Sequence, residues 1–263
     1  MKARIRDYNS LVQRLKALPP RGWGVRQVGD VWGYPWFYVD RMVGVGAPTV
    51  LLSGGMHGEE PGGVEGVFRW LEGDDWPKWR VNWLVLPCIN PYGWERNQRT
   101  NGQRCDINRQ FRNKSAAPEA ELIKRLFQGK TFLFSIEFHE DIGTSGYYLY
   151  ELRLEPPFIG EKVVHAVGKV IATNPDRIID GRRAMGRGLI RPDADLAALK
   201  RRRRWPMAYH LFLNCTGRVL GGETPVTISL EQRARAHNVA LATALDEILG
   251  RKSVFEQSSR LAP

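Results

Sequence analysis

The sequence predicts a single α/β domain with a central, twisted, mixed but mostly parallel sheet flanked by helices. Short apolar runs of strand length alternate along the chain with amphipathic segments of helix length, which is typical of this fold class. The chain has 263 residues, of which 43% are hydrophobic and 25% charged. It contains neither an internal repeat nor a long linker, so we expect one domain over residues 1–263.

The N-terminal part is predicted to begin with a helix and an antiparallel pair of strands. Leu11, Leu15 and Leu18 share one helical face, and Pro19-Pro20 ends the helix. Apolar and polar residues alternate over 23–43, which indicates antiparallel strands at a sheet edge. Continuous apolar runs then predict buried strands at residues 48–55, 81–89 and 131–139.

Helices are predicted where apolar residues recur on one face, near residues 63–71, 118–127, 162–172 and 230–249. Asn90-Pro91-Tyr92-Gly93 is expected to turn the chain after a strand, and Gly221-Gly222-Glu223 to turn it before the last helix. Further strands are expected at 146–152 and around 210–214.

Three polar residues follow predicted buried strands and form a candidate metal site. His57 and Glu60 come directly after the strand that ends in Gly54-Gly55, and His139 ends the run TFLFSIEFH. Since the carboxyl ends of parallel strands carry the functional residues of such sheets, we expect these side chains to meet. Two ligands close in sequence, a third far away and an open fourth position are typical of catalytic zinc. A buried, hydrogen-bonded histidine is the alternative reading of His139.

The other histidines have simpler interpretations. His165 is expected on the polar side of its helix, and His237 shares an apolar face with Leu241, so it is interpreted as a packing residue. His210 flanks a predicted strand, and its role stays open. The three cysteines show no C-x-x-C spacing, so neither a disulfide framework nor a cysteine metal site is expected.

The net charge is +11, and its excess is concentrated between residues 176 and 206, which hold nine arginines and Lys200 against four aspartates. An anionic substrate near the site and a solvated basic surface both explain this segment. No nucleic-acid-binding motif accompanies the charge, so nucleic acid is not an expected partner. The chain lacks both an apolar run of membrane-spanning length and a secretory signal, so no membrane association and a cytoplasmic location are expected.

Several motifs together resemble the zinc carboxypeptidase family, in its small bacterial type, and they occur in the family's order. His57-x-x-Glu60 is similar to the first two zinc ligands, and His139 in Phe138-His139-Glu140 to the third. The pieces similar to the family's N-P-D-G, R-x-x-R, D-L-N-R-N-F and E-T-P motifs are Asn90-Pro91-Tyr92-Gly93, Arg96-Asn97-Gln98-Arg99, Asp106-Ile107-Asn108-Arg109-Gln110-Phe111 and Glu223-Thr224-Pro225.

The resemblance implies the carboxypeptidase fold, one zinc ion bound by His57, Glu60 and His139, and a role for each remaining motif. It implies that Glu223 acts as general base on a water at the zinc. It also implies that Arg96 stabilises the oxyanion, and that Asn108 with Arg109 holds the substrate's free carboxylate. The active-site tyrosine is left open among Tyr209, Tyr147, Tyr148 and Tyr150.

The leading functional hypothesis is therefore a zinc hydrolase that cleaves an amide bond beside a free carboxylate, as a carboxypeptidase or a cell-wall peptide amidase. A deacylase of N-acyl amino acids, of the aspartoacylase and succinylglutamate desuccinylase type, is the first alternative. A basic binding protein with a non-catalytic metal site is the second. A further hypothesis is that some arginines of the basic segment face the substrate and favour an acidic group, with candidates at Arg177, Arg182, Arg183, Arg187 and Arg191. A solvated loop is the alternative interpretation of this segment.

Overall fold

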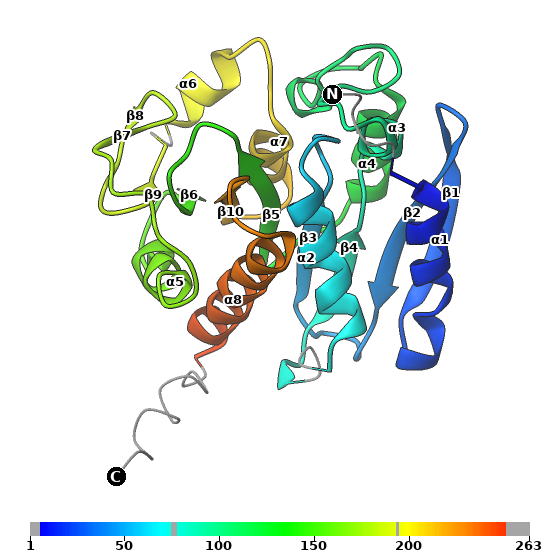
Figure 1. Ribbon diagram of the computed structural model, residues 1–263, viewed down its shortest axis with the longest axis horizontal. Coiled ribbons are helices and arrows are strands. Elements are labelled where there is room, and N and C mark those ends of the chain that lie inside the picture. The colour runs from blue at the N-terminus through cyan, green and yellow to red at the C-terminus, as the bar shows by residue number, and fades with distance from the viewer. Residues whose placement is uncertain (1–5, 75–77, 193–194, 251–263) are drawn as a thin grey trace.

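The centre of the protein is an eight-stranded mixed sheet, seen in a computed structural model that describes residues 6–74, 78–192 and 195–250 (Figure 1). Its strand order is β1-β2-β4-β3-β5-β10-β6-β9. These strands are β1 (Gly24–Val31), β2 (Tyr34–Arg41), β3 (Thr49–Gly54), β4 (Asn82–Leu86), β5 (Phe134–Asp141), β6 (Tyr148–Leu152), β9 (Leu189–Ile190) and β10 (Val219–Pro225). A separate hairpin pairs β7 (Ile178–Ile179) with β8 (Arg182–Arg183).

The four central strands, β4, β3, β5 and β10, run parallel to one another. The hairpin of β1 and β2 extends the sheet antiparallel on one side, and β6 pairs antiparallel with β10 on the other. From β3, the chain crosses to β4 on one side and then returns to β5 on the other. The carboxyl ends of β3 and β5 therefore lie at the switch point of the sheet, where open α/β sheets place their sites.

Helices cover both faces of this sheet. The helices are α1 (Tyr8–Lys16), α2 (Pro61–Glu72), α3 (Pro91–Arg96), α4 (Pro118–Phe127), α5 (Gly160–Val167), α6 (Leu196–Arg201), α7 (Met207–Asn214) and α8 (Leu230–Leu249), with short 3-10 turns at Pro19–Arg21 and Ile107–Arg109. One apolar core joins α1, α2, α5 and α8 to the sheet, and these helices lie side by side in Figure 1. A second core joins α4, α6 and α7 to the opposite face.

The predicted fold class is confirmed, as are the edge hairpin over 23–43, the strands within 48–55, 81–89 and 146–152, and the helices at 63–71, 118–127 and 230–249. The strand predicted over 131–139 begins at Phe134 and continues to Asp141. The helix predicted over 162–172 is α5, which already ends at Val167. No helix in the described ranges is both long and apolar enough to cross a membrane.

Three local predictions were wrong. Residues 210–214 belong to helix α7, which begins after Pro206, because a short apolar run alone does not separate a strand from a buried helix. Asn90 is the N-cap of helix α3 and accepts a hydrogen bond from Gly93 N at 2.9 Å, so its motif starts a helix. Residues 221–223 lie inside strand β10. Gly222 is needed there for packing, since a Cβ at this position would lie 2.8 Å from Tyr147 Oη.

Candidate active site

The candidate metal ligands lie at the carboxyl ends of the two strands that flank the switch point. His57 lies in the loop after β3, Glu60 is the N-cap of α2, and His139 is near the end of β5. The loop turns sharply at Gly55, whose φ of +66° is costly for any residue with a Cβ. This turn brings His57 and Glu60 back against β5.

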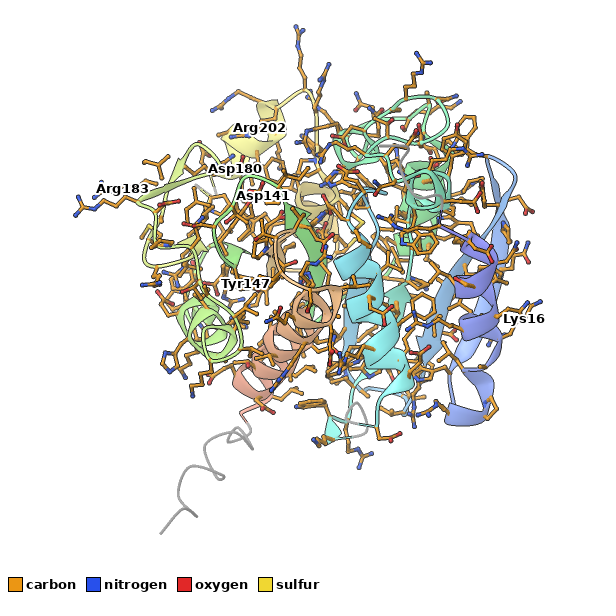
Figure 2. The ribbon with its side chains drawn as sticks, viewed as in Figure 1. Lys16, Asp141, Tyr147, Asp180, Arg183 and Arg202 are labelled. Atoms are coloured by element: carbon orange, nitrogen blue, oxygen red, sulfur yellow. The ribbon has the colours of Figure 1, made fainter. Side chains whose placement is uncertain are left out.

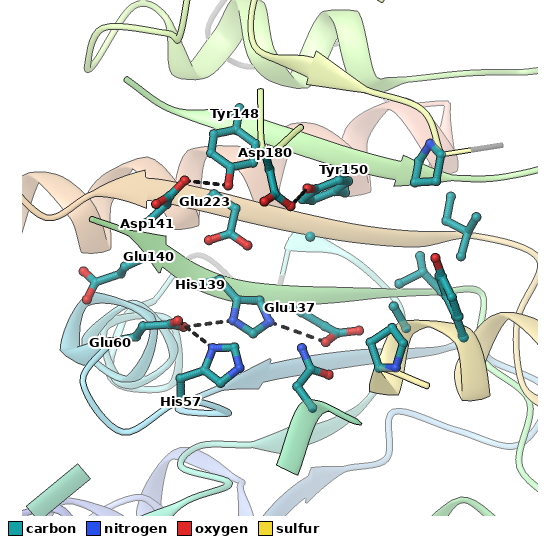
Figure 3. A pocket seen from close by; sticks show the side chains of 18 of the residues that line it. His57, Glu60, Glu137, His139, Glu140, Asp141, Tyr148, Tyr150, Asp180 and Glu223 are labelled. Atoms are coloured by element: carbon teal, nitrogen blue, oxygen red, sulfur yellow. Dashed lines mark hydrogen bonds and ion pairs between the residues drawn. The ribbon is translucent and has the colours of Figure 1, made fainter. Parts of the chain in front are cut away.

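The structure brings these three residues together, in line with the sequence prediction (Figure 3). His57 Nδ1 lies 2.6 Å from Glu60 Oε1, and His139 Nδ1 lies 2.9 Å from Glu60 Oε2. One potential ligand atom from each residue lies within 4.8 Å of the other two, and all three side chains are buried. Both imidazoles therefore direct Nδ1 toward the carboxylate of Glu60.

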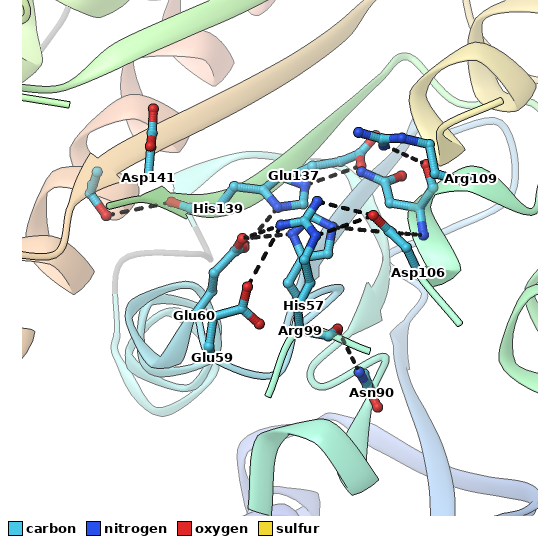
Figure 4. A network of polar contacts seen from close by, with 12 residues as sticks. His57, Glu59, Glu60, Asn90, Arg99, Asp106, Arg109, Glu137, His139 and Asp141 are labelled. Atoms are coloured by element: carbon cyan, nitrogen blue, oxygen red, sulfur yellow. Dashed lines mark hydrogen bonds and ion pairs between the residues drawn. The ribbon is translucent and has the colours of Figure 1, made fainter. Parts of the chain in front are cut away.

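A carboxylate also stands behind each imidazole, on its Nε2 side (Figure 4). Asp106 Oδ1 lies 3.5 Å from His57 Nε2, and Glu137 Oε2 lies 3.6 Å from His139 Nε2. Such carboxylates fix the orientation of metal-binding histidines and increase the electron density on the opposite nitrogen. The arrangement leaves Nδ1 of both rings as the ligand atoms.

The electrostatics of this group favour an added positive charge. Burial opposes charge on both imidazoles, but Glu60 and the carboxylates behind the rings raise the pKa of His57 and of His139 above the usual value. Burial would also raise the pKa of Glu60, but the two histidines hold it at about 2. Two nitrogens and one carboxylate oxygen, surrounded by further carboxylates, match the donor set of a catalytic zinc site. These residues thus fit a divalent metal ion.

Glu223 lies beside the candidate ligands because of the register of the sheet. It pairs with His139 on parallel strand β5 and with Tyr148 on β6, so the three side chains share one face (Figure 3). Burial, together with the carboxylates of Glu60 and Asp141, raises the pKa of Glu223 to about 8. A buried carboxylate with a raised pKa is typical of a group that accepts and returns a proton.

A cavity of about 340 Å³ opens over this same face of the sheet. The next row of paired residues is Glu137, Gly221 and Tyr150, and the missing side chain at Gly221 leaves space beside Glu223. The cavity continues over Val219 and Leu152 toward α7. There is therefore room for a substrate group next to the candidate general base.

Asn108 and Arg109, predicted to hold a carboxylate, both line this cavity. Asn108 Oδ1 accepts a hydrogen bond from Met207 N at 2.9 Å, which leaves the Nδ2 group of its amide as a donor. Arg109 is held beside it by a bond from Nη1 to Asn108 O at 2.8 Å. An amide donor next to a guanidinium is suited to binding a carboxylate.

The structure does not bring Arg96 to the cavity. Its guanidinium stacks over Tyr92 at 3.9 Å and donates to Tyr34 Oη at 2.6 Å, on the outside of α3. Arg99, three residues further on, lines the cavity and lies 3.2 Å from Asp106 and 3.9 Å from Glu60. Helix α3 ends at Arg96, with Asn97 in the left-handed conformation, and this change of direction separates the two arginines.

The wall opposite Arg99 is formed by tyrosines that hold acidic side chains. Tyr148 Oη donates to Asp141 at 2.9 Å, and Tyr150 Oη donates to Asp180 (Figure 3). Asp180 lies in the turn between β7 and β8 with φ of +48°, a conformation that Asp tolerates better than most residues. No arginine or lysine of the described ranges forms a salt bridge with Asp141 or Asp180, but Arg182, two residues after Asp180, lines the cavity as well, so this wall carries charges of both signs.

Of the four tyrosines that the sequence left open, Tyr148, Tyr150 and Tyr209 line the cavity, whereas Tyr147 is buried behind β10. Two other residues of the cavity were missed by sequence reasoning. Glu137 and Asp180 were not predicted, although the alternation along TFLFSIEFH places Glu137 on the same face as His139.

Of the five candidate arginines, Arg182 alone lines the cavity. Arg191 instead pairs with Glu151 and Glu161, and Arg187 donates to Thr173.

None of the remaining histidines lines the cavity. His237 is fully buried and stacks on Phe138 with 4.5 Å between ring centroids, which confirms its packing role. His165 is exposed, as predicted. His210 packs near Phe111 away from the cavity, and burial lowers its pKa.

Comparison with known proteins places this geometry in context. Residues 46–162 match the sequence model of the succinylglutamate desuccinylase/aspartoacylase catalytic domain. This region contains all three candidate ligands, Arg99 and the Asn108-Arg109 pair. No curated protein matches the chain by sequence.

Solved structures share the whole fold. A candidate metallopeptidase from Shewanella amazonensis SB2B is 24% identical, with a TM-score of 0.75 over 92% of this chain and 91% of that one. The metallo-carboxypeptidase of Burkholderia cenocepacia is 17% identical, with a TM-score of 0.67 over 94% and 70% of the two chains. Carboxypeptidase A of Helicoverpa armigera is 14% identical, with a TM-score of 0.69 over 94% and 74%. These matches confirm the zinc carboxypeptidase-like fold that the motifs indicated.

Proposed function

We propose that this chain, which has the zinc carboxypeptidase-like fold, is a zinc-dependent hydrolase that cleaves an amide bond beside a free carboxylate. The observation that carries this proposal is the row formed by His139 and Glu223 across β5 and β10, next to His57 and Glu60. It combines a buried set of metal ligands with a buried carboxylate of raised pKa in one cavity.

His57, Glu60 and His139 would hold the metal. A divalent ion there supplies a Lewis acid that lowers the pKa of water to about 7, and its charge also favours the ionised form of Glu223. Glu223 accepts the proton of the attacking water and returns it to the leaving nitrogen. The buried site that raises its pKa to about 8 suits a group that must hold a proton between these two steps.

The other cavity residues position the substrate. Asn108 and Arg109 bind its free carboxylate through the amide Nδ2 group and the guanidinium. We assign stabilisation of the developing oxyanion to Arg99, which lies in the cavity 3.9 Å from Glu60, in place of Arg96. The space left by Gly221 accepts the side chain next to the carboxylate.

The substitution Glu223→Gln tests the mechanism. We expect kcat for a peptide with a free C-terminus to fall about 10²- to 10⁴-fold, because the general base is lost while the ligands remain. Metal content, measured by mass spectrometry, should stay at that of the wild type. The control is Glu155→Gln, which changes an exposed glutamate outside the cavity. Full activity of Glu223→Gln would disprove its role.

Deacylation of an N-acyl amino acid is a second candidate, favoured by the match to the desuccinylase and aspartoacylase domain. Both reactions break an amide bond next to a carboxylate, so both use the same residues. A panel of N-acetyl and N-succinyl amino acids, compared with peptides of two to six residues, distinguishes them. A higher kcat/KM for peptides that extend beyond the cavity supports the peptidase, and turnover of acyl amino acids alone supports the deacylase.

A further inference from the structure

Five consecutive cationic residues form an exposed strip at the end of α6. This basic strip consists of Lys200, Arg201, Arg202, Arg203 and Arg204, and all five are exposed. Within the described ranges, its one ion pair joins Arg201 to Asp195 at 3.9 Å. Five charges on adjacent residues repel one another, so an anion that binds beside the strip reduces this repulsion and is bound favourably.

The strip is fixed at the mouth of the cavity. Pro192 before it, and Pro206, Ala208 and Tyr209 after it, all line the cavity. The Arg202 guanidinium lies over the Tyr209 ring at 5.5 Å. Figure 2 shows Arg202 at the same end of the molecule as Asp180 and Asp141, which lie in the cavity wall.

Two hydrogen bonds, one of them between main-chain groups, hold this segment to the turn that carries Asn108 and Arg109. Phe111 N donates to Trp205 O at 3.2 Å, and Met207 N donates to Asn108 Oδ1 at 2.9 Å. Buried Leu199 anchors α6 in the core beneath the strip. The strip therefore keeps a fixed position relative to Asn108 and Arg109.

The position of the strip selects the part of a substrate that can reach it. Asn108 and Arg109 bind the terminal carboxylate, so the chain ends at that point and only the acyl part continues out of the cavity. A cavity of about 340 Å³ is near the lower limit of small-molecule sites, so a longer peptide must leave it across the mouth.

We propose that the basic strip is a docking surface for acidic side chains in the acyl part of a peptide substrate, outside the cavity. This inference rests on the proposed function and adds a substrate class, namely peptides with acidic residues several positions before the scissile bond. Charge at the mouth of a cavity raises the association rate of oppositely charged substrates by about 10- to 10³-fold at low ionic strength.

A matched pair of peptides tests this inference. Both end in the same two residues, and they differ only upstream, where one carries three glutamates and the other three glutamines. At low ionic strength we expect kcat/KM of the wild-type, metal-loaded protein to be at least about tenfold higher for the glutamate peptide. The ratio should fall toward one in about 1 M NaCl, where the Debye length is about 3 Å.

The triple variant R201Q/R203Q/R204Q should bring this ratio close to one and leave kcat/KM for the glutamine peptide unchanged. Arg202 is kept because it contacts Tyr209. The matched control K16Q/K130Q/R235Q removes three exposed charges that do not line the cavity, and it should keep the wild-type ratio. A wild-type ratio near one, or an equal ratio in R201Q/R203Q/R204Q, would overturn the proposal.

Direct binding separates this inference from the proposed reaction. If neither peptide is hydrolysed, the proposed function fails, and fluorescence anisotropy of the labelled glutamate peptide still tests the strip. We expect binding to weaken at least about tenfold in R201Q/R203Q/R204Q and not in the control. Tighter binding of a single-stranded oligonucleotide of equal charge, with the same loss in the variant, would overturn the proposal in favour of nucleic acid.

Discussion

The two sides of the cavity are built in different ways. One side, here called the metal side, holds the candidate metal ligands His57, Glu60 and His139, which are buried and supported by carboxylates at the ends of central parallel strands. The opposite side, formed by Tyr148, Tyr150 and the β7–β8 turn, lies toward the edge of the sheet and includes the exposed Asp180. The central strands thus fix the proposed reacting groups, whereas edge strands and loops form the wall across the cavity from them.

Substitutions on the two sides of the cavity should therefore have different effects. Substitutions on the metal side should lower metal affinity or kcat, because the proposed mechanism places these residues at the metal ion. Substitutions on the opposite wall should change KM and leave the metal bound. The largest effects are therefore expected where burial and polar contacts are densest.

The substitution His139→Ala should cause the largest loss. Removal of a partner behind a ligand already costs about 10- to 100-fold in metal affinity, so loss of the ligand itself should cost more than about 100-fold. Bound metal measured after dialysis, together with kcat, gives both quantities. His165→Ala, at an exposed position on α5, is the control and should retain metal and activity. Stoichiometric metal in His139→Ala would contradict the ligand assignment.

Arg99→Ala and Arg96→Ala distinguish two arginines that are close in sequence but separated in space. We expect Arg99→Ala to lower kcat about 10²- to 10³-fold, since a donor to the oxyanion is lost. Arg96→Ala removes only an exposed contact with Tyr34 and Tyr92, so kcat should change less than about threefold. Initial rates at saturating substrate provide the measurement. The opposite order of effects would return the oxyanion role to Arg96.

The metal side was predictable because its signals are local. His57 and Glu60 are three residues apart, and His139 ends an unbroken apolar run, so strand ends alone place all three at one edge of the sheet. Arg96 and Arg99 were harder to distinguish, because both lie in one R-x-x-R motif. The left-handed Asn97 after α3 directs only Arg99 to the cavity, and no simple pattern predicts that turn.

The opposite wall was less predictable because residues far apart in sequence form it. Asp180 reaches Tyr150 through a two-residue turn between two-residue strands, which are too short to produce a periodic pattern. The two glycines before Glu223 indicated a turn, but here they serve packing and space within a central strand. Glycine is used both where there is no room for a side chain and where the chain turns, so the residue alone does not show which of the two applies.

Asp180→Asn tests whether this wall acts on binding alone. The substitution keeps the hydrogen bond from Tyr150 but removes the charge, so substrate contacts weaken by about one hydrogen bond. We expect KM to rise about three- to tenfold, because substrate binding is weakened, with kcat and metal content near wild-type values. Tyr150→Phe, which releases Asp180 from the wall, should act in the same direction. A loss of kcat comparable with that of Arg99→Ala would show that the wall takes part in the reaction.

The smallest effect is expected behind the metal side, where His237 packs on Phe138. Burial, assisted by the charge of His139, lowers the pKa of His237 to about 3. The unfolded chain binds a proton on this residue near pH 6.5, and the folded chain does not until about pH 3. Stability from this neutral histidine is therefore complete above pH 6.5 and decreases toward pH 3, by at most about 1.4 kcal/mol per pH unit.

Urea unfolding of the metal-free protein at pH 7.5 and pH 5.5 measures this contribution. Between these values the wild type should lose about 1 kcal/mol more than His237→Gln, because only the wild type has a histidine at this position that is protonated in the unfolded state alone. Each protein is compared with itself at the two pH values, so a constant cost of the substitution cancels. His165→Gln should follow the wild type, because its exposed ring is accessible to solvent in both states. Equal losses in wild type and His237→Gln would mean that the packing behind the metal side admits a charged imidazole.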